Sequence, residues 1–415
     1  MTTFQHHTLP NGLTIVAEPD PSAHSAAVGF FVKTGARDEP NELMGVSHFL
    51  EHMMFKGTDD LSAEDINRVY DEMGARNNAY TSHEVTCFYA SVTADRIGDA
   101  IDHTARMMRP ALREDDFETE RGVILEEIAM YADNPFWVLY EQTSQRYYGD
   151  HPLGHRVLGT PETIKSLSRD SMAGYFNERY APGATTVALA GDVDFDEACA
   201  RIERLCGHWP SADAPPARVA PMPQRERLEL SEEKFDRGYL LAIAPGPAAQ
   251  SEDRYTATLA AQVLGAADNS RLHWALIEPG LAEEAQAGYQ PGDGTGEFFV
   301  YASGDAAKLD EIEATLLRES LKLAESVSDD DLARIRSRFA TSFTVSAERP
   351  GDTMQRIGRN WSLLGEYRPL SEELERIESV TTASMRALLA ENGSDGGIAP
   401  LTIGTLTPPS GAQRT

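Results

Sequence analysis

The feature that most constrains the fold is an order of elements that occurs twice, once on each side of a proline-rich segment. Residues 210–223 hold five prolines and several alanines, a composition typical of a linker. β-prone runs followed by helical patterns precede this segment, and the same order returns after it. We therefore predict an α+β protein with two domains, residues 1–212 and 225–415, joined by a linker at 213–224. The repeat is one of element order and not of visible residue identity.

The first half supplies clear local signals. Two short apolar runs flank Pro10-Asn11-Gly12, and Asn-Gly between such runs predicts a β-hairpin. Residues 26–33 are apolar enough for a central strand, and residues 78–93 are also β-prone. Ser62, followed by Asp65, predicts the start of a helix. Helical patterns cover residues 45–55, 63–73, 96–108, 114–131 and 195–206, and a further strand covers 185–190. In the second half, strands are expected at 238–244 and 297–302 and helices at 254–264, 307–326 and 329–346.

Composition excludes several classes of function. The chain has 415 residues, and 37 Lys+Arg against 66 Asp+Glu give a net charge of −29. This balance argues against binding to nucleic acid or to an anionic membrane, because both need clustered basic residues. Three scattered cysteines are too few for a disulfide framework. No stretch approaches the roughly 18 apolar residues of a membrane span, and no signal peptide is recognisable at the start, so we expect a cytoplasmic protein.

One pentapeptide carries a chemical signature, His48-Phe49-Leu50-Glu51-His52. On a helix the two histidines are four positions apart and share a face, so both imidazoles can point at one ion. Glu51 lies close enough for its carboxylate to reach a metal-bound water. This H-x-x-E-H order is the inverzincin signature. The alternative is that two ordinary histidines lie beside an exposed glutamate.

A catalytic zinc needs a third protein ligand, which here could be a glutamate, an aspartate or a distant histidine. The helical pattern at 114–131 offers Glu120 and Glu127, which are two turns apart and therefore share a face. The alternative is that the acidic side chains of this helix are simply solvated.

Four segments, in order, resemble the pitrilysin, insulin-degrading enzyme and mitochondrial processing peptidase family of inverzincin zinc metallopeptidases, in its short, bacterial processing-peptidase-like form. Residues 48–58 resemble that family's zinc-binding helix, and residues 78–81 resemble its active-site edge strand. Residues 120–135 resemble its third-ligand helix. The close of its first domain is matched by residues 151–154, 158–160 and 180–183. The resemblance covers most of residues 1–210.

The resemblance assigns roles to five residues. It implies that His48 and His52 are zinc ligands, with Glu127 as the third ligand. It implies that Glu51 is the general base and that Glu120 is a carboxylate supporting the ligands. The same two-nitrogen, one-oxygen set would also suit manganese or cobalt.

The resemblance also places Asn78, Ala79 and Tyr80 on the strand to which the substrate backbone adds. The resemblance implies two homologous domains, each a mostly antiparallel sheet covered by helices, which together form half of a clam-shell chamber. The expected partners are an extended peptide substrate and either a second copy of this chain or a sister subunit. The second domain is expected to lack a metal site.

These inferences predict a zinc-dependent endopeptidase that hydrolyses unfolded or extended oligopeptides through metal-activated water. Two alternatives keep the same fold. One is a catalytically silent or partner-dependent subunit that serves as a scaffold or binds substrate. The other is a processing peptidase that removes targeting sequences.

Overall fold

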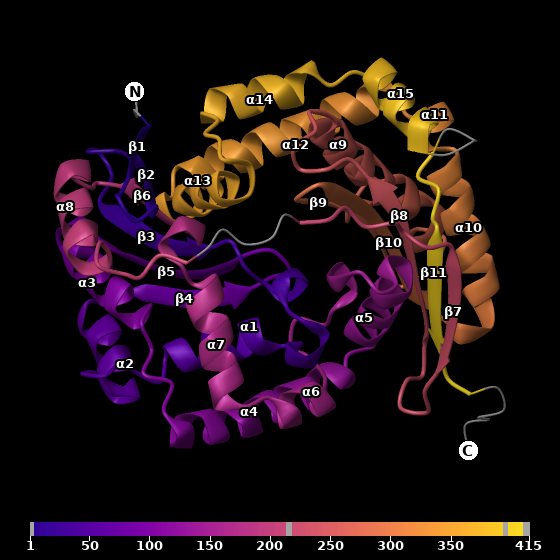
Figure 1. Ribbon diagram of the computed structural model, residues 1–415. Coiled ribbons are helices and arrows are strands. Elements are labelled where there is room, and N and C mark those ends of the chain that lie inside the picture. The colour runs from indigo at the N-terminus through magenta and orange to yellow at the C-terminus, as the bar shows by residue number, and fades with distance from the viewer. Residues whose placement is uncertain (1–3, 213–217, 393–396, 410–415) are drawn as a thin grey trace. The chain divides into compact units, whose positions relative to one another are not determined.

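The computed structural model describes residues 4–212, 218–392 and 397–409, which form two compact units (Figure 1). Each unit has one sheet covered by helices, so the α+β fold class is confirmed. Unit 1 comprises Met1–Ile128, His155–Ala217 and Phe343–Leu370, and unit 2 comprises Ala129–Gly154, Arg218–Ser342 and Ser371–Thr415. Within the described residues, no helix combines the length and apolar character needed to cross a bilayer.

The sheet of unit 1 has six strands in the order β1-β2-β6-β3-β5-β4. All neighbours are antiparallel except β2 and β6, which run parallel. The strands are β1 (Gln5–Thr8), β2 (Thr14–Pro19), β3 (Ser25–Val32), β4 (Arg76–Thr81), β5 (Thr86–Thr93) and β6 (Thr185–Gly191). The predicted hairpin is confirmed as β1–β2, and the predicted central strand is β3, which lies between β6 and β5.

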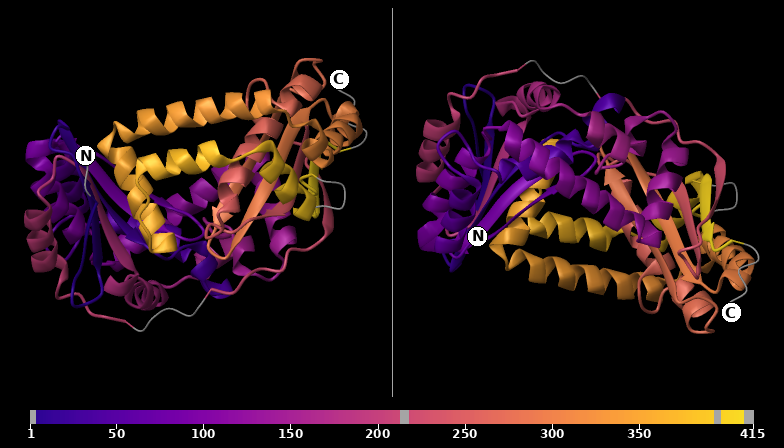
Figure 2. Two further views of the ribbon diagram at one scale, coloured as in Figure 1. Left: turned by 90° about the horizontal axis from the view of Figure 1, so that it is seen from above. Right: turned by 90° about the horizontal axis from the view of Figure 1, so that it is seen from below.

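The sheet of unit 2 repeats this arrangement without β1. Its order is β7-β11-β8-β10-β9, with β7 and β11 parallel and all other neighbours antiparallel. Figure 2 shows these strands, in rose, orange and yellow, side by side. The strands are β7 (Glu226–Ser231), β8 (Gly238–Gly246), β9 (Glu284–Gly292), β10 (Thr295–Gly304) and β11 (Thr402–Thr407). Taken in chain order, the five strands from β2 to β6 correspond to those from β7 to β11, so the repeat of order expected from the sequence is present in three dimensions.

Strand β3 is buried on both faces, which explains its nearly continuous apolar sequence. Val28, Phe30 and Val32 face the larger core, which is built with the helices of the first half of the chain. These are α1 (Val46–Met54), α2 (Ala63–Glu72), α3 (Ile97–Met107), α4 (Glu114–Ala132), the short α6 (Pro161–Ser166), α7 (Arg169–Arg179) and α8 (Phe195–Cys206).

The opposite face of this sheet is covered by a helix from the far end of the chain, α13 (Pro350–Leu364). Figure 1 shows α13 in orange beside β3 and β6. The close approach needs a glycine: a Cβ at Gly358 would lie 2.1 Å from the ring of Phe31. The sheet of unit 2 is covered in a corresponding way by α5 (Pro135–Tyr148), which packs on β8 and β11.

Unit 2 also contains α9 (Asp253–Gly265) against β9 and α10 (Leu309–Leu321) against β10. Its remaining helices are α11 (Leu323–Ser326), the first part of α12 (Asp329–Ala347), α14 (Leu370–Ser379) and α15 (Thr382–Asn392). The domains expected from the sequence, residues 1–212 and 225–415, are contiguous, whereas the compact units are not. Unit 2 includes α5 from the first half of the chain, and unit 1 includes α13 from the second half. Part of the expected linker, residues 213–217, lies outside the described residues.

The β-prone run at 78–93 is a hairpin rather than a single strand. Strands β4 and β5 meet at a turn in which Ser82 Oγ accepts hydrogen bonds from the backbone N–H groups of Glu84 and Val85. A short hydroxyl side chain that bonds the backbone two and three residues ahead favours a turn over a continuous strand. Strand β4 pairs only with β5 and is one of the two edge strands of this sheet, the other being β1.

One buried carboxyl in unit 2 predicts a pH dependence of stability. Glu297 on β10 is buried and accepts hydrogen bonds from the hydroxyls of Tyr148 and Tyr140 on α5. Burial raises the pKa of this carboxyl, and the two hydroxyls offset only part of that rise. Below a pH of about 4.5 both the folded and the unfolded states hold the proton. As the pH rises through the folded-state pKa, the contribution of the protonated group to stability is lost.

We therefore expect Glu297→Gln to gain stability relative to the wild type as the pH rises from about 5 to about 8. Denaturant unfolding of the full chain at both values measures the difference. Glu226→Gln, at an exposed position on β7, is the control and should show no such trend. A Glu297→Gln difference that stays constant with pH would contradict the assignment.

Candidate metal centre

Helix α1 presents its polar residues on one face because its other face is held in the core. Phe49, Leu50 and Met53 are fully buried in the larger core of unit 1. His48 and His52, one turn apart, therefore point together away from that core, and their rings lie 4.8 Å apart.

The start of α1 is fixed by a buried network. The carboxylate of Glu39 accepts the backbone N–H of Gly45 at 2.7 Å and that of Ser47 at 2.8 Å. These are N–H groups that a helix leaves unpaired at its first turn. Burial raises the pKa of Glu39 to about 8. Gly45 has φ +95°, and a Cβ there would lie 2.8 Å from Gly159, so a glycine is required at this position.

Helix α4 brings the third acidic group to this face. The ring of Phe117 stacks on Phe49 of α1 with centroids 4.7 Å apart, and Ile124 is fully buried. Glu120 and Glu127 lie on the same side of α4 as these two residues, because steps of three and four keep one face of a helix. Packing of α4 against α1 thus directs both carboxylates toward the histidines.

His48, His52 and Glu127 form one cluster, with a possible ligand atom from each within 4.8 Å of the others. Glu127 Oε2 lies 3.7 Å from His48 Nε2 and 3.5 Å from His52 Nε2. Ligands about 2.1 Å from a tetrahedral zinc are separated by about 3.4 Å from one another. The two distances from Glu127 to the histidines are therefore close to the ligand separations of a tetrahedral zinc site.

The protonation states also fit a cation. Burial, together with the neighbouring His52, lowers the pKa of His48 to about 4, which leaves a neutral imidazole with a free lone pair at neutral pH. The hydrogen bond with His52 lowers the pKa of Glu127, which keeps this carboxylate ionised. Burial lowers the pKa of His52, but hydrogen bonds with Glu127 and Glu120 outweigh it, so that in the absence of an ion the net shift is upward. The cluster attracts positive charge.

Glu120 contacts His52 on the side away from Glu127 Oε2, through the other ring nitrogen. Its buried carboxylate lies 3.0 Å from His52 Nδ1 and forms an ion pair with Lys56. A proton on Nδ1 that is donated to Glu120 leaves the lone pair of Nε2 facing the cluster. Glu120 therefore lies behind His52 as seen from the cluster, with its charge balanced by Lys56.

Glu51 lies on the same helix between the two histidines and is not part of the cluster of ligand atoms. Its carboxylate accepts a hydrogen bond of 2.6 Å from the hydroxyl of Thr81, the last residue of β4. Burial raises the pKa of Glu51, and the bond from Thr81 offsets part of the rise.

The three residues expected on the substrate strand lie on β4 with different orientations. Ala79 packs toward the core that contains α1, whereas Tyr80 faces the opposite side and donates to Gln355 of α13 at 3.0 Å. Asn78 is exposed, and its Oδ1 accepts the N–H of Ala79. Strand β4 forms the edge of the sheet and runs beside α1.

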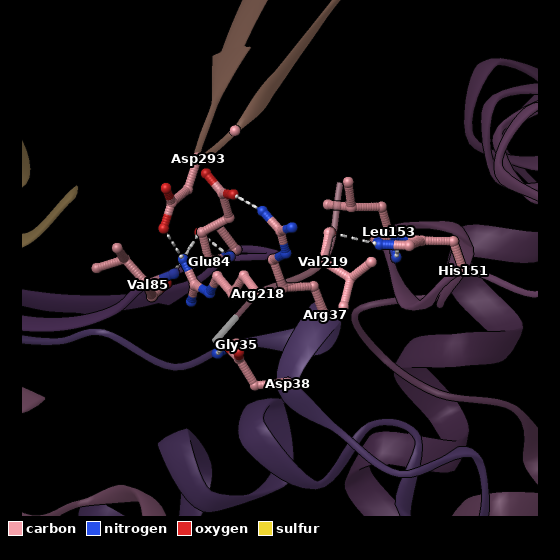
Figure 3. Close-up of polar contacts among 12 residues, drawn as sticks. Gly35, Arg37, Asp38, Glu84, Val85, His151, Leu153, Arg218, Val219 and Asp293 are labelled. Atoms are coloured by element: carbon pink, nitrogen blue, oxygen red, sulfur yellow. Dashed lines mark hydrogen bonds and ion pairs between the residues drawn. The ribbon is translucent and has the colours of Figure 1, made fainter. Parts of the chain in front are cut away.

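The turn after β4 is held to the loop that precedes α1 (Figure 3). Arg37 and Glu84 form a buried ion pair, and the backbone N–H groups of Ala36 and Arg37 donate to the carbonyls of Ser82 and His83. His83 itself is bound through Nε2 to a backbone carbonyl of residue 155, and it does not join the metal cluster. These bonds fix the end of β4 relative to the loop that leads into α1.

Sequence reasoning did not identify Thr81, Lys56 or Glu39 as part of this centre. Thr81 and Lys56 lie inside two segments that carry the family resemblance, 78–81 and 48–58, and this is the sequence signal that points to either residue. Glu39 gave no spacing or periodic signal, and only the fold shows that it binds the first turn of α1.

Two α+β units with one repeated strand order, and a His-His-Glu cluster beside the edge strand of the first, define the class of protein. Two family models match the chain: "Insulinase (Peptidase family M16)" over residues 14–161 and "Peptidase M16 inactive domain" over residues 166–339. The chain belongs to the M16 family of peptidases.

Curated relatives agree with this assignment. The chain is 33% identical over 396 residues to an uncharacterized zinc protease of Streptomyces coelicolor, covering 93% of this chain and 86% of that protein. It is 30% identical over 388 residues to an uncharacterized zinc protease of Bacillus subtilis, covering 93% and 94%.

Solved structures share the fold. A protease from Helicobacter pylori superposes with a TM-score of 0.90 at 21% identity, covering 98% of this chain and all of that one. A peptidase M16 inactive domain from Pseudomonas fluorescens superposes with a TM-score of 0.88 at 17% identity, with 99% of each chain covered.

Proposed function

We propose that this chain is a zinc-dependent endopeptidase that hydrolyses extended or unfolded peptides. The observation that carries the proposal is the cluster of His48, His52 and Glu127 with the carboxylate of Glu51 beside it. The names of the curated relatives, which call them zinc proteases, support the choice of metal.

His48 and His52 would hold the zinc through Nε2, and Glu127 through its carboxylate. A zinc ion bound there supplies a Lewis acid that polarises the scissile carbonyl and lowers the pKa of water. Glu120 keeps the ring of His52 oriented by accepting from Nδ1, and Lys56 balances the charge of that carboxylate.

Glu51 would act as general base. Because Thr81 occupies Oε2, the other carboxylate oxygen is free to accept a proton from the attacking water. The same carboxyl then returns the proton to the amine that leaves. A raised pKa suits both halves of this transfer, since the group must gain and lose a proton in one turnover.

The substrate backbone would add to β4 as a further strand. An edge strand offers unpaired backbone N–H and C=O groups, and pairing with them selects an extended peptide with little demand on its side chains. Asn78, Ala79 and Tyr80 would then hold the substrate, with Ala79 on the side of α1. Within the described residues the metal cluster occurs once, so unit 2 is proposed to serve substrate binding or assembly.

Metal analysis combined with peptide hydrolysis tests the function. We expect about one zinc per chain, cleavage of an internally quenched unstructured peptide, loss of cleavage on chelation and recovery on adding zinc back. The same protein in folded and denatured form should differ, with the denatured form cut faster.

Two other results would favour the alternatives. A chain that binds zinc and cuts nothing until a second subunit is added would be a partner-dependent subunit. Its partner would be a homologous sister chain, and the assembled enzyme could be a processing peptidase. A chain that neither binds zinc nor cuts peptides would be a scaffold with two ordinary histidines.

A further inference from the structure

The end of strand β4 is in direct contact with the proposed base. Thr81 Oγ1 donates to Glu51 Oε2 at 2.6 Å, and within the described residues no other hydrogen bond to this carboxylate is formed. Both side chains are only partly exposed. A glutamate side chain has three rotatable bonds, so a single strong hydrogen bond decides where its carboxylate lies.

The register of the hairpin shows which backbone groups of β4 are free for a peptide. The N–H of Ser82 donates to the carbonyl of Val85, which makes this a hydrogen-bonded pair at the turn. Pairs alternate along an antiparallel ladder, so the next pair, Thr81 with Thr86, is not hydrogen-bonded. The backbone N–H and C=O of Thr81 therefore face the open edge of the sheet. Those of Ala79, two residues earlier, lie on the same edge, where the N–H of Ala79 already donates to Asn78 Oδ1.

We propose that Thr81 is a positioning residue that connects substrate pairing with the base: its backbone receives the peptide strand, and its hydroxyl holds the carboxylate of Glu51 in place. This inference rests on the proposed peptidase function. A peptide that pairs with the edge of β4 binds the backbone of the same residue that orients Glu51. Thr81 thereby fixes the position of the base and of the scissile bond relative to each other.

The surroundings of Thr81 support this role. The turn that follows it is held to the loop before α1 by the buried pair of Arg37 and Glu84 and by two backbone hydrogen bonds. Its neighbour Tyr80 is bound to α13 on the opposite face through Gln355. The hydroxyl thus lies on a strand end that is fixed on both sides, which is what a precise orientation of a catalytic group requires.

Four variants of the full chain test the proposal. Thr81→Val keeps the branched shape that suits a strand and removes the hydroxyl, whereas Thr81→Ser keeps the hydroxyl. Thr93→Val removes an exposed threonine hydroxyl at the end of β5 and is the matched control. For each we would measure kcat and KM on the unstructured peptide, the zinc content and the thermal midpoint, with Glu51→Gln alongside.

We expect Thr81→Val to lower kcat about 10- to 100-fold with KM changed less than about 3-fold, because misplacement of a catalytic group by about 1 Å can cost this much. Zinc content and thermal midpoint should stay at the wild-type values, and Thr81→Ser should restore kcat to within about 3-fold. A merely structural role would lower the midpoint or zinc content together with kcat.

The outcomes distinguish a failure of the positioning role of Thr81 from a failure of the proposed peptidase function. If Glu51→Gln is inactive but Thr81→Val turns over like the wild type, the positioning role is wrong while the peptidase function stands. A Thr81→Val defect that appears in KM alone, or that Thr81→Ser fails to rescue, also overturns the role of the hydroxyl. A wild type that holds zinc and cuts no peptide, alone or with a partner, overturns both.

Discussion

Replacing Glu51 by glutamine is expected to lower kcat about 10²- to 10⁴-fold while about one zinc per chain stays bound. An amide cannot accept the proton of the attacking water, and general acid–base catalysis contributes on this scale. The glutamine can still accept the hydrogen bond from Thr81, so the fold around the site should persist. Peptide turnover and metal content, measured on the same preparation, give the result.

Glu64→Gln is a suitable control, because it makes the same change on an exposed first turn of α2. It should leave both readings unchanged. Wild-type turnover in Glu51→Gln would mean that another group takes the proton. Loss of zinc in that variant would instead make Glu51 a ligand and would contradict its assignment as the general base.

Local signals were sufficient to predict the parts of the fold that short stretches determine. The Asn11-Gly12 hairpin, the doubly buried strand at 26–33 and the capping box of Ser62 with Asp65 each depend on neighbours in sequence. The helical pattern at 114–131 ends shortly before Asn134, and the helices expected from the sequence include none that follows at once. Asn134 begins α5, because its side chain accepts two backbone N–H groups of the next turn.

What the sequence could not reveal depends on distant partners. Helix α13 belongs to the sheet of unit 1 and α5 to that of unit 2, and an amphipathic pattern does not say which sheet a helix will cover. Edge strands β7 and β9 were also missed, because their exposed, polar residues lack the apolar run that marks a buried strand.

The candidate site likewise contains residues that local sequence predicts and residues that only the fold brings together. His48, Glu51 and His52 share one helix, so helical geometry alone predicts that they cluster. Glu127 lies far along the chain, and the spacing of acidic residues alone is equally consistent with a solvated helix face. Only the family resemblance distinguishes Glu127 from its acidic neighbours. Thr81 is a single polar residue, and its contact with Glu51 follows only from the way β4 lies beside α1.

The largest effect on the metal itself is expected at Glu127. Replacing it by alanine removes one of the three proposed ligands, so zinc affinity should fall by more than the roughly 10- to 100-fold that follows loss of an outer partner. Peptide cleavage should disappear at the zinc concentration that saturates the wild type. Competition with a chromogenic chelator measures the dissociation constant.

Glu126→Ala is the matched control, because it removes the same charge from the adjacent position of α4. Residues next to each other on a helix point about 100° apart, and Glu126 is exposed whereas Glu127 faces both histidines at 3.5–3.7 Å. If Glu126→Ala keeps a zinc affinity close to that of the wild type, the loss in Glu127→Ala reflects a lost ligand. It then does not reflect a weaker overall attraction of zinc to a chain with net charge −29. Equal losses in the two variants would mean that long-range charge holds the metal, and a greater loss in Glu126→Ala would make Glu126 the third ligand.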